Sequence, residues 1–346
     1  MRVLVTGLGT YWGGSLAQEL EQRDDVEVVV GLDTEDPKVP LERTEFVRAD
    51  SSYSILARIV RATQIDTILH THMIVDTRNI SARALHEINV IGTMNLLAAA
   101  GAADSPVRRV IVKSSTLVYG STYQDPNFFR EEMRRARSPR TRVERSLIEV
   151  EDYLRDFAED NPHVVVSLLR FSNVLGANLD TPLSRALRLP IVPEILGFDP
   201  RLQFTHHEDV LGALLFATAH DVPGIYNVAA DGLIPWSEVC AILGKRRFPL
   251  PPVFTNAAVE PWRRLNLLQL PPEALDLLRY GRGVDNRRFK RAGFRYRYTS
   301  AGAIEAFGHA LRLEKAVGDA EPEYRYERDV ENFFRHSPAV VRSGDA

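Results

Sequence analysis

Four glycines stand close together near the start of the sequence, in the run TGLGTYWGG at residues 6–14. They follow a short apolar run, Arg2–Thr6, and precede Ser15–Gln22, in which two leucines lie four residues apart on one helical face. A second apolar run, Val26–Leu32, ends in Asp33. The order strand, glycine turn, helix, strand and acid is typical of units that bind the diphosphate of a dinucleotide. We therefore predict a dinucleotide site here.

This turn offers two kinds of contact to such a ligand. Glycine lets the backbone approach a diphosphate, and the first N–H groups of the helix are free to donate hydrogen bonds to it. Asp33 is placed to accept the hydroxyls of an adenosine ribose, and its charge repels a 2′-phosphate, so the sequence favours NAD over NADP. The expected cofactor contacts at the turn are Gly7, Gly9, Thr10, Tyr11, Trp12, Gly13 and Asp33.

The glycine spacing departs from both usual forms. A GxGxxG turn needs a glycine at position 12, where Trp12 stands, and a GxxGxxG turn needs one at position 10, where Thr10 stands. Each form therefore lacks one glycine. Two interpretations stay open: an altered turn that binds a dinucleotide, and a turn that has kept its shape and lost the ligand.

Composition limits the classes of protein. The 346 residues are 45% hydrophobic and 26% charged, as in ordinary globular chains, and the net charge of −3 argues against bulk binding to nucleic acid. The single cysteine, Cys240, excludes an internal disulfide and suits a reducing compartment. The first strand begins at residue 2, which leaves no room for a signal peptide, and no apolar run approaches the ~20 residues of a membrane span. We predict a cytoplasmic protein with no transmembrane segment.

Strands and helices alternate along the first half of the chain. After the first unit we expect strands at Phe46–Asp50, Thr67–His72, Val107–Ser114 and Val164–Arg170, and helices at Ser54–Thr63, Leu85–Ala100 and Arg142–Glu159. This alternation predicts an α/β fold, a Rossmann doubly wound parallel sheet. The ends of the third and fourth strands add Asp50, Ser51, His70 and Thr71 to the expected cofactor contacts. Because no cysteine or cluster of carboxylates accompanies His70 and His72, they predict no metal site.

The texture changes after Gly176, where prolines are frequent and the elements are short. We expect residues 176–202 and 231–312 to form a smaller C-terminal α/β substrate lobe. Phe204–Ala219 and Gly224–Ala229 are expected to return to the main sheet, so the Rossmann domain would comprise 1–175 plus 203–230. Residues 313–346 are polar and acidic, which indicates a loosely packed tail.

Eight runs, in order along residues 1–312, resemble the extended short-chain dehydrogenase/reductase family, of the NAD-dependent epimerase/dehydratase type. The runs are TGLGTYWGG, VVVGLD, NVIGTMNLL, KSSTLVYG, LRFSNVLG, QFTHHEDVLGAL, PGIYNVAADG and VDNRRFKRAGFRYRYT. The likeness extends to an actinobacterial group labelled UDP-glucose 4-epimerase-like. It implies NAD as cofactor, a small-molecule substrate such as a nucleotide sugar, and a homodimer formed through the helices at Leu85–Ala100 and Arg142–Glu159. It also places Asn173 in the substrate cleft, and makes His206 a helix cap or a contact of the substrate pocket.

In this family a Ser or Thr on the SSxxVYG strand and a YxxxK pair on the next helix form the active site. The serine position falls on Ser115. With Glu149 as the acid of the pattern YxxxKxxxE, the lysine position falls on Arg145 and the tyrosine position on Thr141. A threonine hydroxyl is a far weaker acid than a tuned phenol, and arginine can hold a ribose or phosphate without carrying a proton. Tyr123, in the following loop, is the candidate to replace the missing phenol.

Seven arginines crowd the loop at 130–145. One interpretation is a solvated face balanced by Glu131, Glu132 and Glu144; the other is an anion-binding mouth for a diphosphate, a lipid headgroup or a partner's acidic surface. Two functions likewise stay open. The first is an NAD-dependent epimerase, dehydratase or oxidoreductase, and the second is a non-catalytic nucleotide-binding scaffold or regulator of the same fold.

Overall fold

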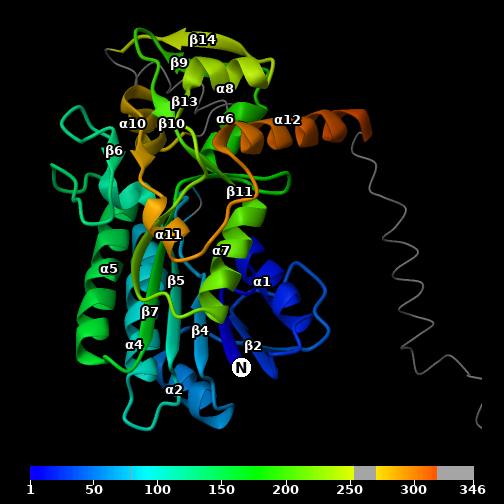
Figure 1. Cartoon of the computed structure of the whole chain (residues 1–346), viewed down its shortest axis with the longest axis vertical. Helices are drawn as coiled ribbons and strands as arrows, with labels where there is room; N and C mark the ends of the chain where they lie inside the picture. Colours follow the sequence, from blue (N-terminus) through cyan, green and yellow to red (C-terminus); the bar gives the residue numbers. More distant parts are fainter. Residues whose placement is uncertain (79, 253–269, 318–346) are drawn as a thin grey trace, which may run out of the picture.

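A seven-stranded parallel sheet forms the centre of the molecule, in a computed structural model that describes residues 1–78, 80–252 and 270–317 (Figure 1). In spatial order the strands are β12 (Gly224–Val228), β7 (Val165–Phe171), β5 (Arg109–Ser115), β4 (Thr67–His70), β1 (Arg2–Thr6), β2 (Val28–Asp33) and β3 (Thr44–Arg48). The chain runs outward from β1 to β3 and then restarts at β4 on the other side. The predicted Rossmann doubly wound sheet is confirmed, with its topological switch point between β1 and β4.

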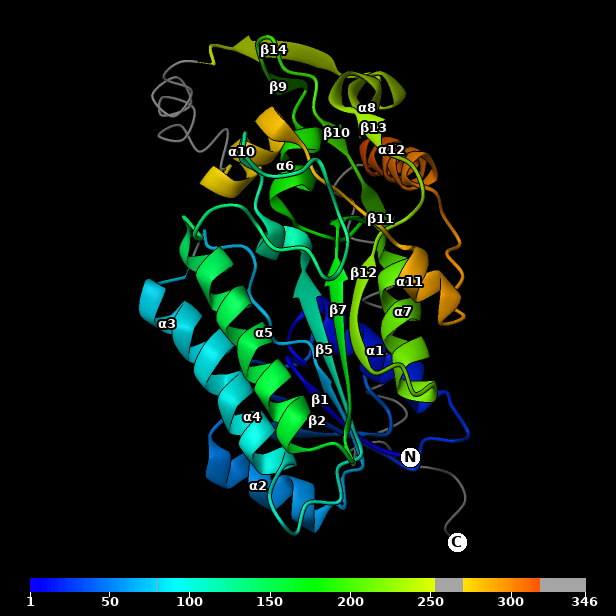
Figure 2. The same cartoon turned by 60° about the vertical axis from the view of Figure 1, so that its left-hand side comes forward.

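Helices cover both faces of this sheet. Figure 2 shows one layer made of α2 (Tyr53–Ala62), α4 (Gly92–Ala100) and α5 (Arg142–Asp160), and an opposite layer that contains α1 (Tyr11–Glu21) and α7 (His207–Ala219). Alternation along each buried strand supplies both cores. In β5, Val110 and Val112 face the α4–α5 layer, whereas Ile111 faces the α1–α7 layer.

The helix expected at Leu85–Ala100 is present with a local irregularity. It begins earlier, as α3 (Ala82–His86), passes through a π-helical segment at Glu87–Ile91, and continues as α4. The buried residues of the segment, Asn89 and Val90, face the interior.

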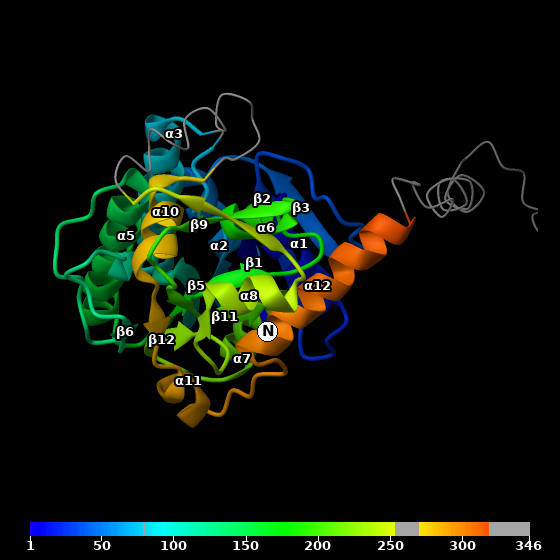
Figure 3. The ribbon, with the colours of Figure 1, turned by 90° about the horizontal axis from the view of Figure 1, so that it is seen from above.

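A second hydrophobic core lies beyond the carboxyl ends of the strands, toward which β5 and β7 point (Figure 2). The elements of this part are α6 (Pro182–Arg188), β9 (Ile191–Ile195), β10 (Arg201–Leu202), β13 (Ile234–Pro235), α8 (Trp236–Ile242), β14 (Arg246–Leu250), α10 (Pro272–Tyr280) and α12 (Ser300–Val317). Seen from above, they lie over the end of the sheet (Figure 3). Trp236, 1% exposed, belongs to this core.

The chain crosses between the two parts more than once. As predicted, the segment after α7 returns to the main sheet as β12. Two short parallel pairs link distant segments: β8 (Asn173–Leu175) pairs with β11 (Phe204–His206), and β6 (Phe128–Phe129) pairs with β15 (Gly283–Val284). Helix α11 (Arg287–Arg291) follows β15 and packs beside β12.

The C-terminal helix α12 extends past residue 312. Helix α12 includes residues 313–317, which were predicted to belong to the tail; residues 318–346 lie outside the described part of the chain. Within the described ranges, no helix combines the length and the apolar character required to cross a bilayer.

Candidate functional site

The glycine turn closes tightly between β1 and α1. A Cβ on Gly13 would lie 2.2 Å from the carbonyl oxygen of Gly7, and Gly7 has φ +77° with the backbone of His72 at 2.9 Å from its own added Cβ. Thr10 caps the helix: its Oγ1 donates to the Gly7 carbonyl at 2.6 Å and accepts from the Gly13 N–H at 3.2 Å. The structure therefore uses the 7–10–13 spacing, and threonine replaces its middle glycine.

Tyr11 and Trp12 are the first residues of α1, so their N–H groups have no intrahelical acceptor and carry the positive end of the helix dipole. Their rings stand edge to face at 5.1 Å, and the Tyr11 ring lies 6.1 Å from that of His207 at the start of α7. The helix start is thus a donor site bordered by aromatic rings.

Asp33 is fixed beside this turn at the end of β2. Its Oδ2 accepts from the Gly9 N–H at 2.9 Å, and its Oδ1 accepts from the N–H groups of Thr34 and Glu35 at 2.7 and 3.1 Å. A carboxylate offers about four acceptor positions. One acceptor position on Oδ2 therefore has no donor among the described residues, and the ribose contact stays a prediction.

The side chains of His70 and Thr71 do not face this turn. His70 Nδ1 lies 2.7 Å from Thr6 Oγ1 and Nε2 lies 2.9 Å from Thr93 Oγ1 of α4, and burial lowers the pKa of His70 to about 3. Thr71 Oγ1 donates to the Thr6 carbonyl at 2.7 Å. Both predicted contacts are thus side chains that hold β4 in place.

His72, which follows them, faces the turn instead. It is half-buried, and that burial lowers its pKa although Asp33 and Glu35 act in the opposite sense. The remaining predicted contacts lie at the end of β3. Asp50 is exposed and accepts from the Ser52 N–H at 3.2 Å, and the Ser51 carbonyl accepts from Asn95 Nδ2 at 3.0 Å.

Ser115 ends β5 and is half-buried; its Oγ accepts from the Leu117 N–H at 3.2 Å. The two nearby tyrosines differ. Tyr119 is buried, donates to Asn227 Oδ1 at 2.7 Å and accepts from Arg170 Nη1 at 2.6 Å; burial raises its pKa to about 12. Tyr119 is therefore packed at the end of the strand, with its hydroxyl engaged by Asn227 and Arg170.

Tyr123, the predicted replacement phenol, is 66% exposed, and its hydroxyl accepts from Arg137 Nη2. The Arg137 guanidinium also lies 4.9 Å from the centre of its ring. The structure thus places this phenol at the surface of the loop, engaged by an arginine.

Thr141 and Arg145 stand at the start of α5. Thr141 is the N-cap in a capping box with Glu144: its Oγ1 accepts from the Glu144 N–H at 3.4 Å, and Glu144 Oε2 accepts from the Thr141 N–H at 3.2 Å. Arg145 is exposed and donates to the carbonyls of Pro139 and Arg140, each at 3.5 Å. Both side chains are accordingly used at the helix terminus.

The acid that α5 turns toward the sheet is Glu151. It is 4% exposed, and Arg170 of β7 donates to it from Nε at 2.9 Å and pairs with it from Nη2 at 2.5 Å. Glu149, the acid used above to count positions, is half-buried. Counting from Glu151 instead places Val143 and Leu147, both buried, at the tyrosine and lysine positions. Since no lysine occurs between Lys113 and Lys245, α5 lacks the YxxxK lysine in either register.

The two predicted substrate contacts lie where β8 and β11 pair. Asn173 Nδ2 donates to the Gln203 carbonyl at 2.9 Å. His206 is the N-cap of α7 and accepts from the Glu208 N–H at 3.4 Å; its ring is tilted by 31° against that of Tyr298, with ring centres 3.9 Å apart. Burial lowers the pKa of His206 to about 4, so its ring is neutral near pH 7.

Lys113 is a site residue that the sequence patterns did not single out. It lies on β5, on the same face as Ile111 and two residues before Ser115, and is 6% exposed. Its Nζ lies 5.2 Å from the centre of the Trp12 ring, and burial lowers its pKa to about 8. A lysine inside the apolar run VIVK was the signal in the sequence.

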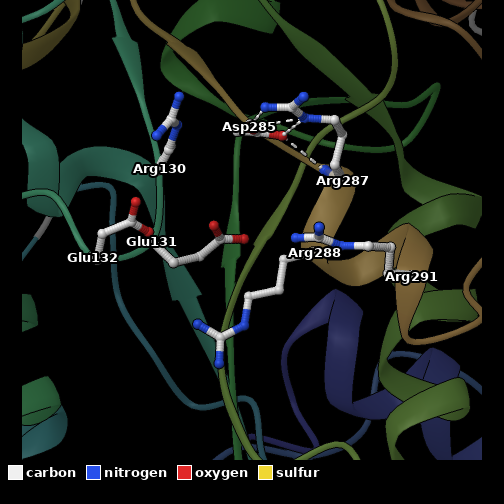
Figure 4. Close-up of a pocket in the computed structure, with 7 residues that line it drawn as sticks. All are labelled: Arg130, Glu131, Glu132, Asp285, Arg287, Arg288 and Arg291. Carbon is white, nitrogen blue, oxygen red and sulfur yellow. Dashed lines mark hydrogen bonds and ion pairs between the residues drawn. The ribbon is translucent and has the colours of Figure 1, made fainter.

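The arginine-rich loop has no single role. Arg135 is buried and pairs with Glu144 at 3.2 Å, whereas Arg140 reaches Asp276 of α10 at 3.2 Å. Arg130 lines a surface cleft of about 530 Å³, opposite the arginines of α11 (Figure 4). The other residues that line the cleft are Glu131, Glu132, Asp285, Arg287, Arg288 and Arg291.

Known proteins resemble this chain in sequence and in fold. A model of the NAD dependent epimerase/dehydratase family matches residues 3–229. Uncharacterized proteins of Mycobacterium tuberculosis and Mycobacterium bovis are 36% identical over 318 residues, which is 90% of this chain and 83% of each relative.

Two solved structures illustrate the fold. The UDP-glucuronic acid 4-epimerase of Bacillus cereus, in complex with UDP-glucuronic acid and NAD, has a TM-score of 0.68 at 17% identity and covers 90% of this chain and 99% of its own. The UDP-glucose 4-epimerase of Thermotoga maritima with UDP-glucose has a TM-score of 0.68 at 18% identity, covering 92% and 100%. With the parallel sheet and the glycine turn, these matches show that the chain belongs to the NAD-dependent epimerase/dehydratase family.

Proposed function

We propose that the protein binds NAD at the glycine turn and a nucleotide sugar beside it, in a site that lacks the Tyr–Lys pair of its family. The observation that carries the cofactor assignment is the contact between Gly13 and Gly7, which leaves no room for a side chain at position 13. Bound NAD would supply a group that accepts and returns a hydride.

The residues present fit that cofactor. The N–H groups of Tyr11 and Trp12 suit a diphosphate, and Asp33 retains an acceptor position for a ribose hydroxyl. Thr10 caps the helix without occupying the turn, because its side chain folds back onto Gly7 and Gly13. We infer that the altered glycine spacing is compatible with binding.

A nucleotide sugar is the substrate class that the neighbours favour. The Bacillus cereus enzyme was solved with UDP-glucuronic acid and the Thermotoga maritima enzyme with UDP-glucose. In this chain Asn173 and His206 lie at the carboxyl end of the sheet, next to the second core. Ligands of open α/β sheets bind at this edge.

The chemistry beyond binding has two forms. If the protein is an enzyme, Ser115 donates a hydrogen bond to the reacting oxygen and a group other than an α5 tyrosine carries the proton. If it is not, the fold serves as a nucleotide-binding scaffold or regulator. The absence of any lysine from α5 favours the second form, and the retained Asp33, Ser115 and Asn173 favour the first.

Cofactor preference is tested at Asp33. Calorimetry is expected to show NAD binding more tightly than NADP, because the Asp33 carboxylate repels a 2′-phosphate. Asp33→Ala is expected to weaken NAD binding about tenfold or more, since a hydrogen bond to a charged group is removed. It is also expected to reduce the difference in affinity between NAD and NADP. The control is Asp36→Ala, which breaks the exposed pair with Arg48 and leaves both affinities unchanged. Equal affinity of the wild type for the two cofactors would contradict the assignment.

Assembly is tested on α4. An exposed apolar stripe is formed by Ile91, at the end of the π-helical segment, and by Met94 and Ala98 of α4. Ile91 is 40% exposed and Met94 is 37% exposed. We propose that it contributes to an isologous homodimer. Sedimentation is expected to give a dimer for the wild type and a monomer for Met94→Asp at micromolar concentration. Leu196→Asp, at an exposed leucine after β9, is the matched control and stays dimeric. A monomeric wild type would refute the proposal.

A further inference from the structure

Lys113 is a buried cation for which the described residues supply no counter-charge. It is 6% exposed, and within the described ranges its Nζ has no hydrogen-bond acceptor and no carboxylate within ion-pair distance. Its one recorded partner is the face of the Trp12 ring, at 5.2 Å. By contrast, Lys290 is exposed and forms an ion pair with Asp231 at 2.8 Å.

Such a side chain is unfavourable in the folded protein by itself. Buried charges in proteins are normally paired or coordinated, because burial removes hydration that a single aromatic ring replaces only in part. An apolar side chain such as Met, Leu or Val would fit this run better, because the neighbouring Ile111 and Val112 are buried apolar residues of the same strand. The ammonium group therefore indicates an acceptor that the described part of the chain does not provide.

The position of Lys113 identifies the kind of acceptor. Trp12 is the second residue of α1, so the ring beside Nζ belongs to the helix terminus whose free N–H groups attract an anion. On the other side, Ser115 follows two residues later on the same face of β5. The Trp12 side chain therefore connects two positive groups, the start of α1 and the Lys113 ammonium.

We propose that Lys113 is a ligand-binding residue of the cofactor site and that its Nζ contacts the diphosphate of the bound dinucleotide on the Ser115 side. The inference rests on the proposed binding of NAD. Lys113, on β5, then supplies the cationic contact to the cofactor that α5 does not supply.

The substitution Lys113→Met tests this with two readouts of opposite sign. Methionine has similar length and no charge, so the ligand-free variant is expected to melt at a higher temperature than the wild type. Calorimetry is expected to show NAD and ADP binding at least about tenfold more weakly to the variant, because both ligands carry the diphosphate, whereas adenosine binds equally to the two proteins. Lys290→Met is the matched control and leaves the NAD and ADP affinities unchanged.

The outcomes separate the two proposals. If the wild type binds NAD and Lys113→Met binds NAD and ADP as tightly, the assignment of Lys113 is overturned while the cofactor assignment stands. A loss confined to NAD with ADP unaffected overturns the diphosphate contact. A fall in melting temperature shows that Lys113 supports the fold and overturns the inference. If the wild type binds neither NAD nor ADP, the proposed function itself fails.

Discussion

Purified protein incubated with NAD and UDP-glucose or UDP-galactose is expected to produce no measurable 4-epimer. General acid–base catalysis typically contributes about 10²–10⁴-fold, and in the site that we propose α5 carries neither a tyrosine nor a lysine at the positions of the family pair. Thr141 and Arg145 are engaged at the helix terminus, so neither side chain replaces the missing proton carrier. The epimer ratio, followed by coupled assay or NMR, provides the measurement.

Restoring the pair tests which register of α5 is correct. Thr141→Tyr with Arg145→Lys follows from counting back from Glu149, and Val143→Tyr with Leu147→Lys follows from Glu151. Weak hydride transfer with little change in NAD affinity is expected from the pair in the correct register. Thr141→Tyr also removes the cap of α5, which costs about 1 kcal/mol, so melting curves accompany the assay. Robust turnover by the wild type would show that another group already carries the proton.

The largest loss of stability is expected from Arg170→Met. The substitution leaves the Glu151 carboxylate buried with the Ser114 hydroxyl as its remaining recorded partner, and removing one member of a buried ion pair costs about 3–5 kcal/mol. Urea denaturation followed by circular dichroism measures the change in the free energy of unfolding.

Two controls separate burial from charge in that experiment. Asp152→Asn breaks an exposed pair with Arg155 on the same helix and is expected to cost about 1 kcal/mol or less. Arg170→Met combined with Glu151→Leu removes both charges and is expected to recover part of the loss, since two apolar residues replace the pair. A single Arg170→Met variant as stable as the wild type would contradict the role of the pair.

The parts of the fold that the sequence predicts well depend on local pattern. Arg2–Thr6 matches β1 exactly because an apolar run, a glycine turn and an acid occur within one continuous stretch. Helix α5 was expected at nearly its observed bounds, since its apolar spacing is regular.

The parts of the site that were missed depend on packing between distant segments. Glu149 and Glu151 look equivalent in sequence, yet Glu151 lies on the stripe that contains Leu147, Val150 and Leu154, and so faces the sheet. Applying helical periodicity to the acids would have distinguished them. His70 fitted a cofactor contact by position, and only its contacts with Thr6 and Thr93 show that it faces α4.

The return of the chain to the sheet has a consequence for how the protein is made. Strand β12, at residues 224–228, completes the edge of a sheet whose other six strands are finished by residue 171. Until it is synthesised, β7 presents an unpaired row of backbone groups with apolar side chains on both faces, which is a template for association with other chains. A fragment that ends near residue 175 would retain that open edge and aggregate. A single cut in the chain therefore cannot isolate a domain that contains the complete sheet.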